Sequence, residues 1–387
     1  MKERKICLGD KTGEGKVTQS ILKPRFLHGK VRTITFVFPD VPHVISGGLK
    51  MVLEYANRLT ARGYNIQLAF DCHGGIYNKR KYIPVFLKKH LLYPFLIKKH
   101  PKWFALDSRV KKFLLKDGIT DNEIPDADII VTTAAITAEQ VARLSEKKGK
   151  KIYFIQGFEN WTDDWPAERV EATYRLGMKN IVVAKWLEDK VRTAGADCVL
   201  IPNGLDFKVF NIDVPIRKRT DHMVSMLYHE SPLKGAKYGL QALEKLKEKY
   251  SDLKAHIFGV PKRPESLPAW INYTQNATEL QLREIYNHST IYMCPSIEES
   301  FGLPGAEAMA CGAAYVASDY GGVHEYAKDR RNVLLSSPRD VLGLVENISY
   351  LFDHPEERIR IAENGYQDIK RLDWESALNK FEAVLQS

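Results

Sequence analysis

The sequence predicts an α/β protein built from two Rossmann-like, doubly wound domains that face a central cleft. Three observations predict this fold: the length of the chain, a first series of alternating strand and helix patterns, and a second such series after a break in periodicity. The chain has 387 residues, which exceeds one ordinary hydrophobic core and fits two domains of typical size. Its 44% hydrophobic and 27% charged residues are typical of a soluble globular protein.

The first series of patterns begins after a polar, aperiodic stretch that we interpret as an extension of residues 1–31. Residues 33–40 form a β-branched and aromatic run that ends in a turn signal, and residues 46–63 place apolar side chains on one helical face. Residues 65–70 are the next strand pattern, so this strand–helix–strand unit predicts a parallel sheet. Further strand patterns cover 127–135, 150–158, 179–185 and 198–204, and a helical pattern covers 137–149.

Periodicity is lost over residues 207–221, which we interpret as the connection between a first domain of residues 32–208 and a second domain of residues 209–372. The second domain repeats the alternation of strands and helices. Its predicted strands cover 222–228, 254–260, 290–296 and 313–318, and its predicted helices cover 237–250, 279–287, 305–312 and 340–352. Ligands of such sheets bind at the carboxyl ends of the strands, so we expect the active site in the cleft between the domains.

The charge of the chain is uneven and points to an anionic partner. The formal net charge is +9, and the excess of Lys and Arg lies wholly in the first half. A basic half suggests phosphate, nucleic acid or acidic lipid headgroups as the partner. No apolar run reaches the roughly 18 residues that span a bilayer. The five cysteines lie far apart without a CxxC pair, which argues against a disulfide framework and a zinc site, so we expect a cytoplasmic protein.

Residues 294–312 are the most informative segment, because they read as a strand, a loop and the start of a helix. Pro304 suits the first turn of that helix, where its missing N–H has no intrahelical partner. Gly302 and Gly305 let backbone amides approach a ligand closely. The N-terminus of the helix presents free N–H groups and a positive dipole end, which suits a diphosphate or a polar sugar.

Two glutamates flank this helix start and offer acceptors for sugar hydroxyls. Glu299 lies in the loop, and Glu307 lies eight positions later in the helix. Both carboxylates could accept hydrogen bonds from one bound polyol. The alternative is that Glu307 only complements the helix dipole and that Glu299 is a solvated loop residue.

The whole segment resembles the signature of the retaining family 4 glycosyltransferases, which have the GT-B fold. The signature is matched by Glu299, Phe301, Gly302, Leu303, Pro304, Glu307, Ala308, Met309, Ala310 and Gly312. The resemblance implies that Glu299 contacts the hydroxyls of the donor sugar and that Glu307 contacts the nucleotide ribose. It places Phe301, Gly302 and Leu303 in the donor site. Glu298 competes with Glu299 by position, but the spacing between the two glutamates of the signature selects Glu299.

The resemblance extends from about residue 33 to residue 385 and implies further site residues. Lys234 resembles the lysine that binds the donor diphosphate and acts in catalysis, because a cation there offsets charge on the leaving nucleotide; the alternative is a solvated surface lysine. Gly47 and Gly48 resemble the family's glycine loop near the diphosphate and the acceptor, although they could form only a tight turn. The C-terminal helix, residues 373–387, is expected to pack back on the first domain.

Two positions depart from the family pattern. Where the family usually has an arginine that helps to clamp the diphosphate, this chain has Tyr228 and His229. A histidine cannot supply a bidentate, permanently charged fork, so we expect His229 to form a weaker or pH-sensitive part of the donor site. The first-domain histidine that many relatives place beside the donor sugar is absent, and Gln156 or Glu159 is expected to take its role.

We expect no metal and no cofactor, because the nucleotide sugar is a substrate and no metal motif fits. Asp126 and Asp128 have the DxD spacing by which glycosyltransferases of the other large fold hold a metal ion, but here they precede a strand, where aspartates commonly end a loop. None of the 11 histidines shows HxH or HExxH spacing.

A basic, aromatic stretch covers residues 79–118. Its lysines alternate with Tyr93, Phe95, Trp103 and Phe104, a combination expected of a surface that lies against anionic headgroups. The alternative is an insertion whose apolar residues pack on the first domain while its lysines are solvated. A lipid-linked or polymeric acceptor would explain the membrane interpretation, and no nucleic-acid motif accompanies the charge.

Together these observations predict a metal-independent, retaining glycosyltransferase. It would transfer a sugar from a nucleotide-diphosphate-sugar donor to a saccharide or lipid-linked acceptor in the assembly of cell-surface polysaccharide or glycolipid. We expect it in the cytoplasm, peripheral to the inner face of the cell membrane if the basic stretch binds lipid. Two alternatives stay open: a nucleotide-sugar epimerase of the same fold, and a non-catalytic scaffold that binds polyanions or membranes.

Overall fold

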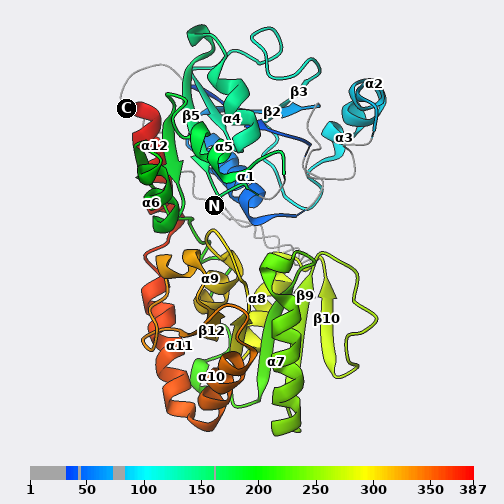
Figure 1. The fold of residues 1–387 in the computed structure, drawn as a ribbon, viewed down its shortest axis with the longest axis vertical. Helices are drawn as coiled ribbons and strands as arrows, with labels where there is room; N and C mark the ends of the chain where they lie inside the picture. The colour runs from blue at the N-terminus through cyan, green and yellow to red at the C-terminus, as the bar shows by residue number, and fades with distance from the viewer. Residues whose placement is uncertain (1–31, 42–44, 73–82, 161–162) are drawn as a thin grey trace, which may run out of the picture.

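The computed structural model describes residues 32–41, 45–72, 83–160 and 163–387. The predicted extension, residues 1–31, and the first part of the basic stretch, residues 79–82, lie outside the described residues. Two α/β domains are stacked along the long axis of the molecule (Figure 1). Each domain is built around one parallel sheet, so the prediction of two Rossmann-like, doubly wound domains is confirmed.

The first domain contains a seven-stranded parallel sheet in the order β3-β2-β1-β4-β5-β6-β7. Its strands are β1 (Thr33–Phe38), β2 (Asn65–Asp71), β3 (Lys111–Leu115), β4 (Ile129–Thr132), β5 (Lys150–Ile155), β6 (Lys179–Val182) and β7 (Cys198–Leu200). Its helices and helical turns are α1 (Gly47–Ala61), α2 (Val85–Leu87), η2 (Lys88–Leu92), α3 (Tyr93–Lys99), α4 (Ala135–Ala142), η3 (Glu146–Lys148), α5 (Ala167–Thr173) and α6 (Lys185–Thr193).

The second domain contains a six-stranded parallel sheet in the order β10-β9-β8-β11-β12-β13. Its strands are β8 (Met223–Tyr228), β9 (Lys254–Gly259), β10 (Ile271–Gln275), β11 (Ile291–Cys294), β12 (Ala314–Ser318) and β13 (Leu334–Ser336). The helices and turns of this half are η4 (Ile216–Lys218), η5 (Pro232–Lys234), α7 (Ala236–Lys249), α8 (Glu279–His288), α9 (Leu303–Ala310), η6 (Gly321–Glu325), α10 (Val341–Asp353), α11 (Pro355–Ile369) and α12 (Trp374–Gln386).

The two sheets share one topology, and this topology positions the site. In each sheet the strand order reverses at one point, between β1 and β4 in the first domain and between β8 and β11 in the second. Ligands of doubly wound sheets bind outside the carboxyl ends of the strands at such a switch point. The loops that follow β8 and β11 are therefore the ligand loops expected of the second domain.

Local sequence explains why the elements nearest the cleft form where they do. Helix α1 begins after Ser46, whose side-chain oxygen accepts a hydrogen bond from the Leu49 N–H at 3.4 Å. The central strands β4 and β11 have the sequences IIVT and IYMC, and every residue in them is buried. Such continuous apolar runs are typical of parallel strands that helices cover on both faces.

The C-terminal helix α12 lies on the first domain, in contact with α1 (Figure 1). Phe381 of α12 stacks on Tyr55 of α1 with ring centroids 4.3 Å apart, and Trp374 lies edge-on to the same ring at 5.0 Å. The carbonyl of Leu385 accepts a hydrogen bond from Arg32 at 2.9 Å. The chain therefore returns to the first domain after it has completed the second sheet.

The segment α2–η2–α3 projects from the side of the first domain near β3 (Figure 1). Tyr93 is buried in the core of that domain, whereas Phe86 and Phe95 are exposed. One side of the segment therefore packs on the domain, as the insertion interpretation expects, while the other side presents apolar surface. Within the described part of the chain, none of the helices combines the length and apolar character needed to cross a membrane.

Candidate active site between the two domains

A lysine and a glutamate meet at the switch point of the second sheet. Lys234 lies at the end of the loop after β8, Glu299 lies in the loop after β11, and Lys234 Nζ is 3.3 Å from Glu299 Oε1. Ser296 Oγ donates a hydrogen bond of 2.9 Å to the same carboxylate oxygen. Glu299 is buried and Lys234 is partly exposed, so the cation borders open space while the carboxylate is held in place.

Backbone contacts fix these two loops against each other. The N–H of Ile297 donates to the carbonyl of Leu233 at 2.7 Å. Gly235 has φ +62, and a Cβ there would lie 1.9 Å from the carbonyl oxygen of Pro295. Only glycine fits this position, because any side chain would collide with the neighbouring loop. The close approach keeps the Lys234 backbone beside the loop that carries Glu299.

His229 lies in the same loop but does not act as a second fixed cation. Its Nδ1 accepts a hydrogen bond from the Ser231 N–H at 2.9 Å. Burial lowers the pKa of His229, and the nearby charge of Lys234 lowers it further. The imidazole is therefore neutral at pH 7, and Lys234 supplies the positive charge of this loop.

Helix α9 starts at Leu303 and is held by a chain of tyrosine hydroxyls. Tyr326 donates to the carbonyl of Gly302 at 2.8 Å, and its hydroxyl lies 3.0 Å from that of Tyr320. A Cβ on Gly302 would lie 2.2 Å from the Tyr320 hydroxyl. Phe301 is buried against Tyr326, with ring centroids 5.4 Å apart, so its side chain belongs to the core and only its backbone faces the loop.

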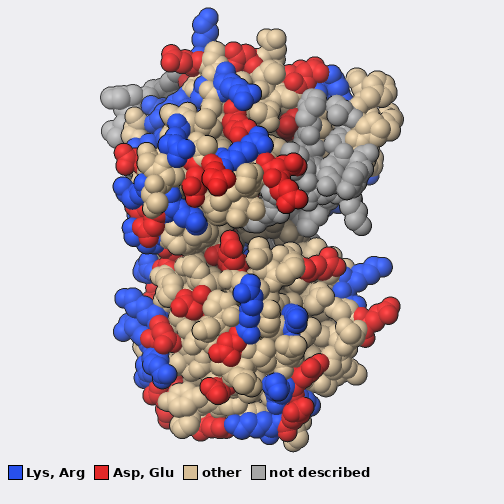
Figure 2. All heavy atoms as spheres, in the orientation of Figure 1, with Lys and Arg blue, Asp and Glu red and all other residues tan. Residues whose placement is uncertain are grey.

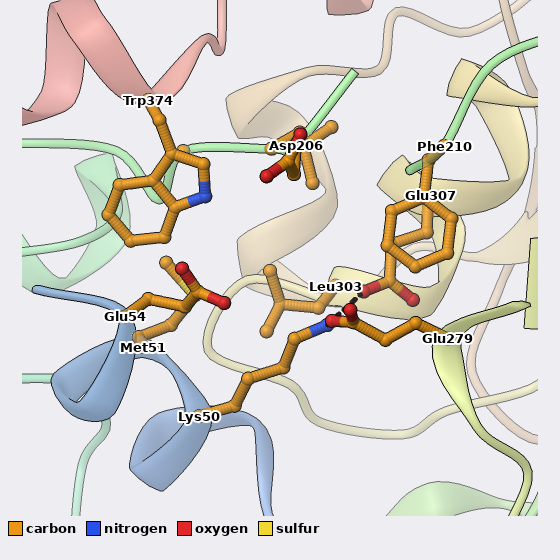
Figure 3. A pocket seen from close by; sticks show the side chains of 11 residues that line it. Lys50, Met51, Glu54, Asp206, Phe210, Glu279, Leu303, Glu307 and Trp374 are labelled. Carbon is orange, nitrogen blue, oxygen red and sulfur yellow. Dashed lines mark hydrogen bonds and ion pairs between the residues drawn. The ribbon is translucent and has the colours of Figure 1, made fainter. Parts of the chain in front are cut away.

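Glu307 is bound by a lysine from the other domain (Figure 3). Lys50 Nζ, from the first turn of α1, lies 3.1 Å from Glu307 Oε1 and 2.8 Å from Glu279 Oε1 at the start of α8. The Tyr286 hydroxyl donates a hydrogen bond of 3.4 Å to the other oxygen of Glu307. Glu307 is buried, so this ion pair crosses the boundary between the domains with little access to water.

Opposite pKa effects act on this ion pair. Burial raises the pKa of Glu307, and the charge of Lys50 opposes that rise. Burial by itself lowers the pKa of Lys50, but the carboxylates of Glu307 and Glu279 outweigh it and raise the pKa above its usual value. Lys50 is therefore a firmly charged cation, and its charge favours the ionised form of Glu307.

Gly47 and Gly48, expected in a glycine loop, are the first two residues of α1 and lie near residues from both domains. A Cβ on Gly47 would lie 3.2 Å from the Leu303 side chain at the start of α9. A Cβ on Gly48 would lie 3.5 Å from the side-chain amide of Gln156, which follows β5. Gln156 Oε1 is buried and has no hydrogen-bond partner among the described residues. Gly47, Gly48, Gln156 and Leu303 therefore come together at the boundary between the domains.

A small cavity lies between the two domains, next to Lys50. It is lined by Lys50, Met51, Glu54, Gly204, Leu205, Asp206, Phe210, Glu279, Leu303, Glu307 and Trp374 (Figure 3). Its volume of about 20 Å³ leaves room for a single water molecule. Figure 2 shows charged side chains of both signs around the waist at which the domains meet.

The remaining sequence candidates have structural partners. Glu159 is buried and accepts a hydrogen bond from the Ala135 N–H at 2.9 Å, at the start of α4. Asp126 pairs with Lys148 at 2.6 Å, and Asp128 accepts from the Thr33 N–H at 2.7 Å. These two aspartates are therefore engaged separately within the first domain.

Sequence reasoning missed the residues that join the domains. Lys50, Glu279 and Tyr286 surround Glu307 but belong to no motif, and Trp186 of α6 donates a hydrogen bond of 2.9 Å to the carbonyl of Ser300. One signal pointed to Lys50. A lysine in the first turn of a helix opposes the helix dipole, so a carboxylate nearby would stabilise it.

The fold is the GT-B fold of glycosyltransferases. Sucrose-phosphate synthase from Thermosynechococcus elongatus superposes with a TM-score of 0.70 at 16% identity, over 92% of this chain and 98% of that chain. HepE from Anabaena in complex with UDP-glucose gives a TM-score of 0.67 at 14% identity, over 92% and 99% of the two chains. Identities this low show a shared fold and nothing finer.

Residues 212–368 match the family model described as glycosyl transferases group 1. This segment of the second domain therefore matches the glycosyl transferase group 1 family, in agreement with the resemblance found in the sequence. The D-inositol 3-phosphate glycosyltransferase of Corynebacterium urealyticum is 26% identical over 217 residues, which are 51% of this chain and 50% of that protein. The chain spans about half the length of each of these curated relatives.

Proposed function

We propose that this protein is a glycosyltransferase that moves a sugar from a nucleotide-diphosphate-sugar donor to a saccharide or lipid-linked acceptor. The observation that carries the proposal is the pair formed by Lys234 and Glu299, 3.3 Å apart, in the two loops at the switch point of the second sheet. Helix α9 starts just after Glu299. A cation and a helix N-terminus suit a diphosphate, and a carboxylate suits sugar hydroxyls.

Each donor group has a partner in this arrangement. Lys234 and the N-terminus of α9 bind the diphosphate, and Lys234 offsets the negative charge that grows on the leaving phosphate as the glycosidic bond breaks. Glu299 accepts hydrogen bonds from the sugar hydroxyls, and Glu307 accepts them from the ribose. These roles require no metal ion, because the positive charge comes from Lys234 and the helix.

The acceptor enters from the first domain, near Gly47, Gly48 and Gln156. The bond between the anomeric carbon and the phosphate oxygen breaks, and the bond to the acceptor oxygen forms on the same face of the sugar. The acceptor proton moves to the leaving phosphate, which conserves charge without a separate base. The buried, unpartnered Oε1 of Gln156 can accept a hydrogen bond from a hydroxyl of the donor sugar, which is the role expected of it from the sequence.

A thermal-shift screen identifies the donor. UDP-, GDP-, dTDP- and ADP-sugars are added one at a time, and a ligand that binds the folded state raises its stability by about 2.7 kcal/mol at 100 times its Kd. UDP-glucose is the first compound to test, because the Anabaena neighbour is a complex with it. No shift with any donor would favour the scaffold alternative over an enzyme.

Replacement of Lys234 tests the catalytic role. The Lys234→Ala protein should transfer sugar about 10²-fold more slowly, the scale of one lost electrostatic contact in a transition state. Lys237→Ala is the matched control, because Lys237 is an exposed lysine in the first turn of α7, three positions after Lys234. Normal transfer by a folded Lys234→Ala protein would contradict the diphosphate assignment. Isomerised donor formed without acceptor would favour the epimerase alternative.

We also propose that the segment α2–η2–α3 binds an anionic membrane surface and so brings the acceptor site close to the membrane. Phe86 and Leu91 are each 67% exposed, and Phe95 is 54% exposed. Lys98 and Lys99 lie in the last turn of α3, and Lys99 Nζ is 4.0 Å from the centroid of the Phe95 ring. The end of the segment near α2 shows as uncharged surface in Figure 2. Apolar side chains beside lysines are typical of surfaces that insert among anionic headgroups.

Vesicle binding tests this surface. The protein should sediment with phosphatidylglycerol vesicles more than with phosphatidylcholine vesicles, because the lysines add an electrostatic attraction to the apolar contact. Phe86→Ser with Leu91→Ser should abolish sedimentation. Leu342→Ser is the matched control, since Leu342 is 60% exposed on the second domain. Equal binding by the double variant and the control would contradict the assignment.

A further inference from the structure

Lys50 forms an ion pair with Glu307, the carboxylate that the proposed function assigns to the nucleotide ribose. Lys50 comes from the first domain and Glu307 from the second, and their charged atoms are 3.1 Å apart. Figure 3 shows the lysine reaching between the carboxylates of Glu307 and Glu279 beside Leu303. The adjoining cavity of about 20 Å³ has room for one water molecule but not for a sugar ring. A ribose can therefore reach Glu307 only if Lys50 gives way.

We propose that Lys50 and Glu279 are positioning residues that control access of the nucleotide to Glu307. In the nucleotide-free protein Lys50 pairs with Glu307 and holds the domains together. When a nucleotide binds, its ribose hydroxyls replace Lys50 on Glu307, and after transfer Lys50 returns and helps to expel the nucleotide diphosphate. The inference rests on the proposed function, because it assumes that Glu307 binds ribose.

Glu279 makes this exchange feasible without an unpaired buried cation. Lys50 Nζ is already 2.8 Å from Glu279 Oε1, so the lysine can leave Glu307 and keep one carboxylate. The side chain of Glu279 is 46% exposed and that of Glu307 is 6% exposed, so the move takes Lys50 toward water. Lys50 Nζ also lies 5.3 Å from the centroid of the Phe210 ring. This cation–π contact does not depend on either carboxylate.

The ion pair holds an interface that is otherwise closely packed. Leu303 at the start of α9 lies 3.2 Å from the Cβ position of Gly47, one turn before Lys50 on α1. The ion pair of Lys50 and Glu307 therefore lies beside the packing contact between α1 and α9. The geometry couples occupancy of the ribose site to the way in which the two domains meet.

The first test is the affinity for nucleotides of the Lys50→Met protein. Binding of UDP, GDP and ADP is measured by calorimetry, and the nucleotide that binds the wild-type protein best is used throughout. The Lys50→Met protein should bind it about 10-fold more tightly, because the ribose then supplies the partner of a buried carboxylate that has lost its own. Lys50→Arg retains the cation and should bind close to wild type. Unchanged or weaker binding by Lys50→Met would overturn the proposal.

The second test uses Glu279, and its expected sign is opposite. Glu279→Gln removes the carboxylate to which Lys50 moves, so Lys50 stays on Glu307 and nucleotide affinity should fall by several-fold. In the Lys50→Met background the same change should have no effect, because no lysine remains to compete. A merely structural role of Glu279 would give the same effect in both backgrounds. Equal effects in the two backgrounds would therefore overturn the proposal. If Lys50→Met were too unstable to study, unchanged or tighter nucleotide binding by the Glu279→Gln protein alone would overturn it.

The Glu307→Ala protein separates failure of this inference from failure of the proposed function. If it binds the nucleotide as tightly as wild type, Glu307 does not bind ribose, and both the assignment and the inference fail. If it binds more weakly while Lys50→Met binds no more tightly, the ribose assignment stands and the inference alone fails. Circular dichroism of each variant without nucleotide confirms that it is folded.

Discussion

Glu159 is a buried carboxylate whose ionisation opposes folding. It accepts one hydrogen bond, from the Ala135 N–H at 2.9 Å, and burial raises its pKa to about 7. The ordinary pKa of a glutamate is 4.5, so the folded protein binds this proton more tightly than the unfolded chain does. The stabilisation by the protonated form is complete below about pH 4.5 and is lost as the pH rises through about 7.

The Glu159→Gln protein should therefore gain stability relative to wild type as the pH rises. Glutamine keeps an oxygen that accepts from Ala135 and has no proton to lose, so the gain approaches about 3 kcal/mol at most above pH 7. Urea unfolding of both proteins at pH 5 and pH 8 measures the difference. A free-energy difference that is the same at the two pH values would show that Glu159 does not titrate in this range.

Some residues of the site could be predicted from the sequence, and others could not. The spacing of the signature selected Glu299 over Glu298, and in the structure Glu299 faces Lys234 while Glu298 is exposed. Glu299 and Glu307 lie in one short segment, so the local sequence was enough to identify Glu299. The partner of Glu307 is Lys50, 257 positions away. That contact depends on how the two domains meet, which no local pattern encodes.

At the scale of elements, the start of α9 depends on two glycines packed against tyrosines. Gly302 has φ +84, and a Cβ on Gly305 would lie 2.4 Å from the Tyr315 hydroxyl. The hydroxyls of Tyr315 and Tyr320 are 2.7 Å apart, so the two rings form a fixed wall. Gly302 and Gly305 are therefore needed for packing as well as for access to a ligand.

The Gly302→Ala protein should lose about 3 kcal/mol of stability and most of its transfer activity. The loss combines left-handed backbone strain of about 1–2 kcal/mol with a collision against the Tyr320 hydroxyl, which displaces the helix start. Gly177→Ala is the matched control, because Gly177 has φ +77 and no atom within 4 Å of its Cβ position. It should lose only the strain, about 1–2 kcal/mol, and keep its activity. Equal losses of stability in the two variants, measured by urea unfolding, would mean that the Tyr320 side chain moves aside to accommodate the added methyl group.

Three of the four edge strands, β3, β10 and β13, were not predicted from the sequence, whereas the edge strand β7 was. β3 has the sequence KKFLL, in which lysines protect an edge strand from pairing with other chains but hide the strand pattern. β10 is only partly buried, and β13 has three residues. Strands in the middle of each sheet were predicted correctly because helices bury both of their faces and select continuous apolar runs. Edge strands bear less of that selection.

At the scale of the whole molecule, the described residues join the domains through the C-terminal helix and through polar contacts. α12 returns to the first domain, Trp186 donates a hydrogen bond to the Ser300 carbonyl, and Lys50 pairs with Glu307. α12 is the largest of these contacts, because its apolar residues are buried in the first core. The hydrogen bond and the ion pair are small and can be exchanged. The molecule thus combines a permanent connection at one side with polar contacts next to the candidate site.

The Phe381→Ala protein tests whether α12 belongs energetically to the first domain. Phe381 is fully buried against Tyr55 and Phe154, so its loss should destabilise by about 3–5 kcal/mol. Amide hydrogen exchange should then show loss of protection in β4 and β5 while β11 and β12 keep theirs, because the cavity forms in the first core alone. Leu342→Ala, at an exposed position on α10, should change neither sheet. If both sheets lost protection equally, the domains would unfold as one unit, and the polar contacts near the site would be stronger than their number suggests.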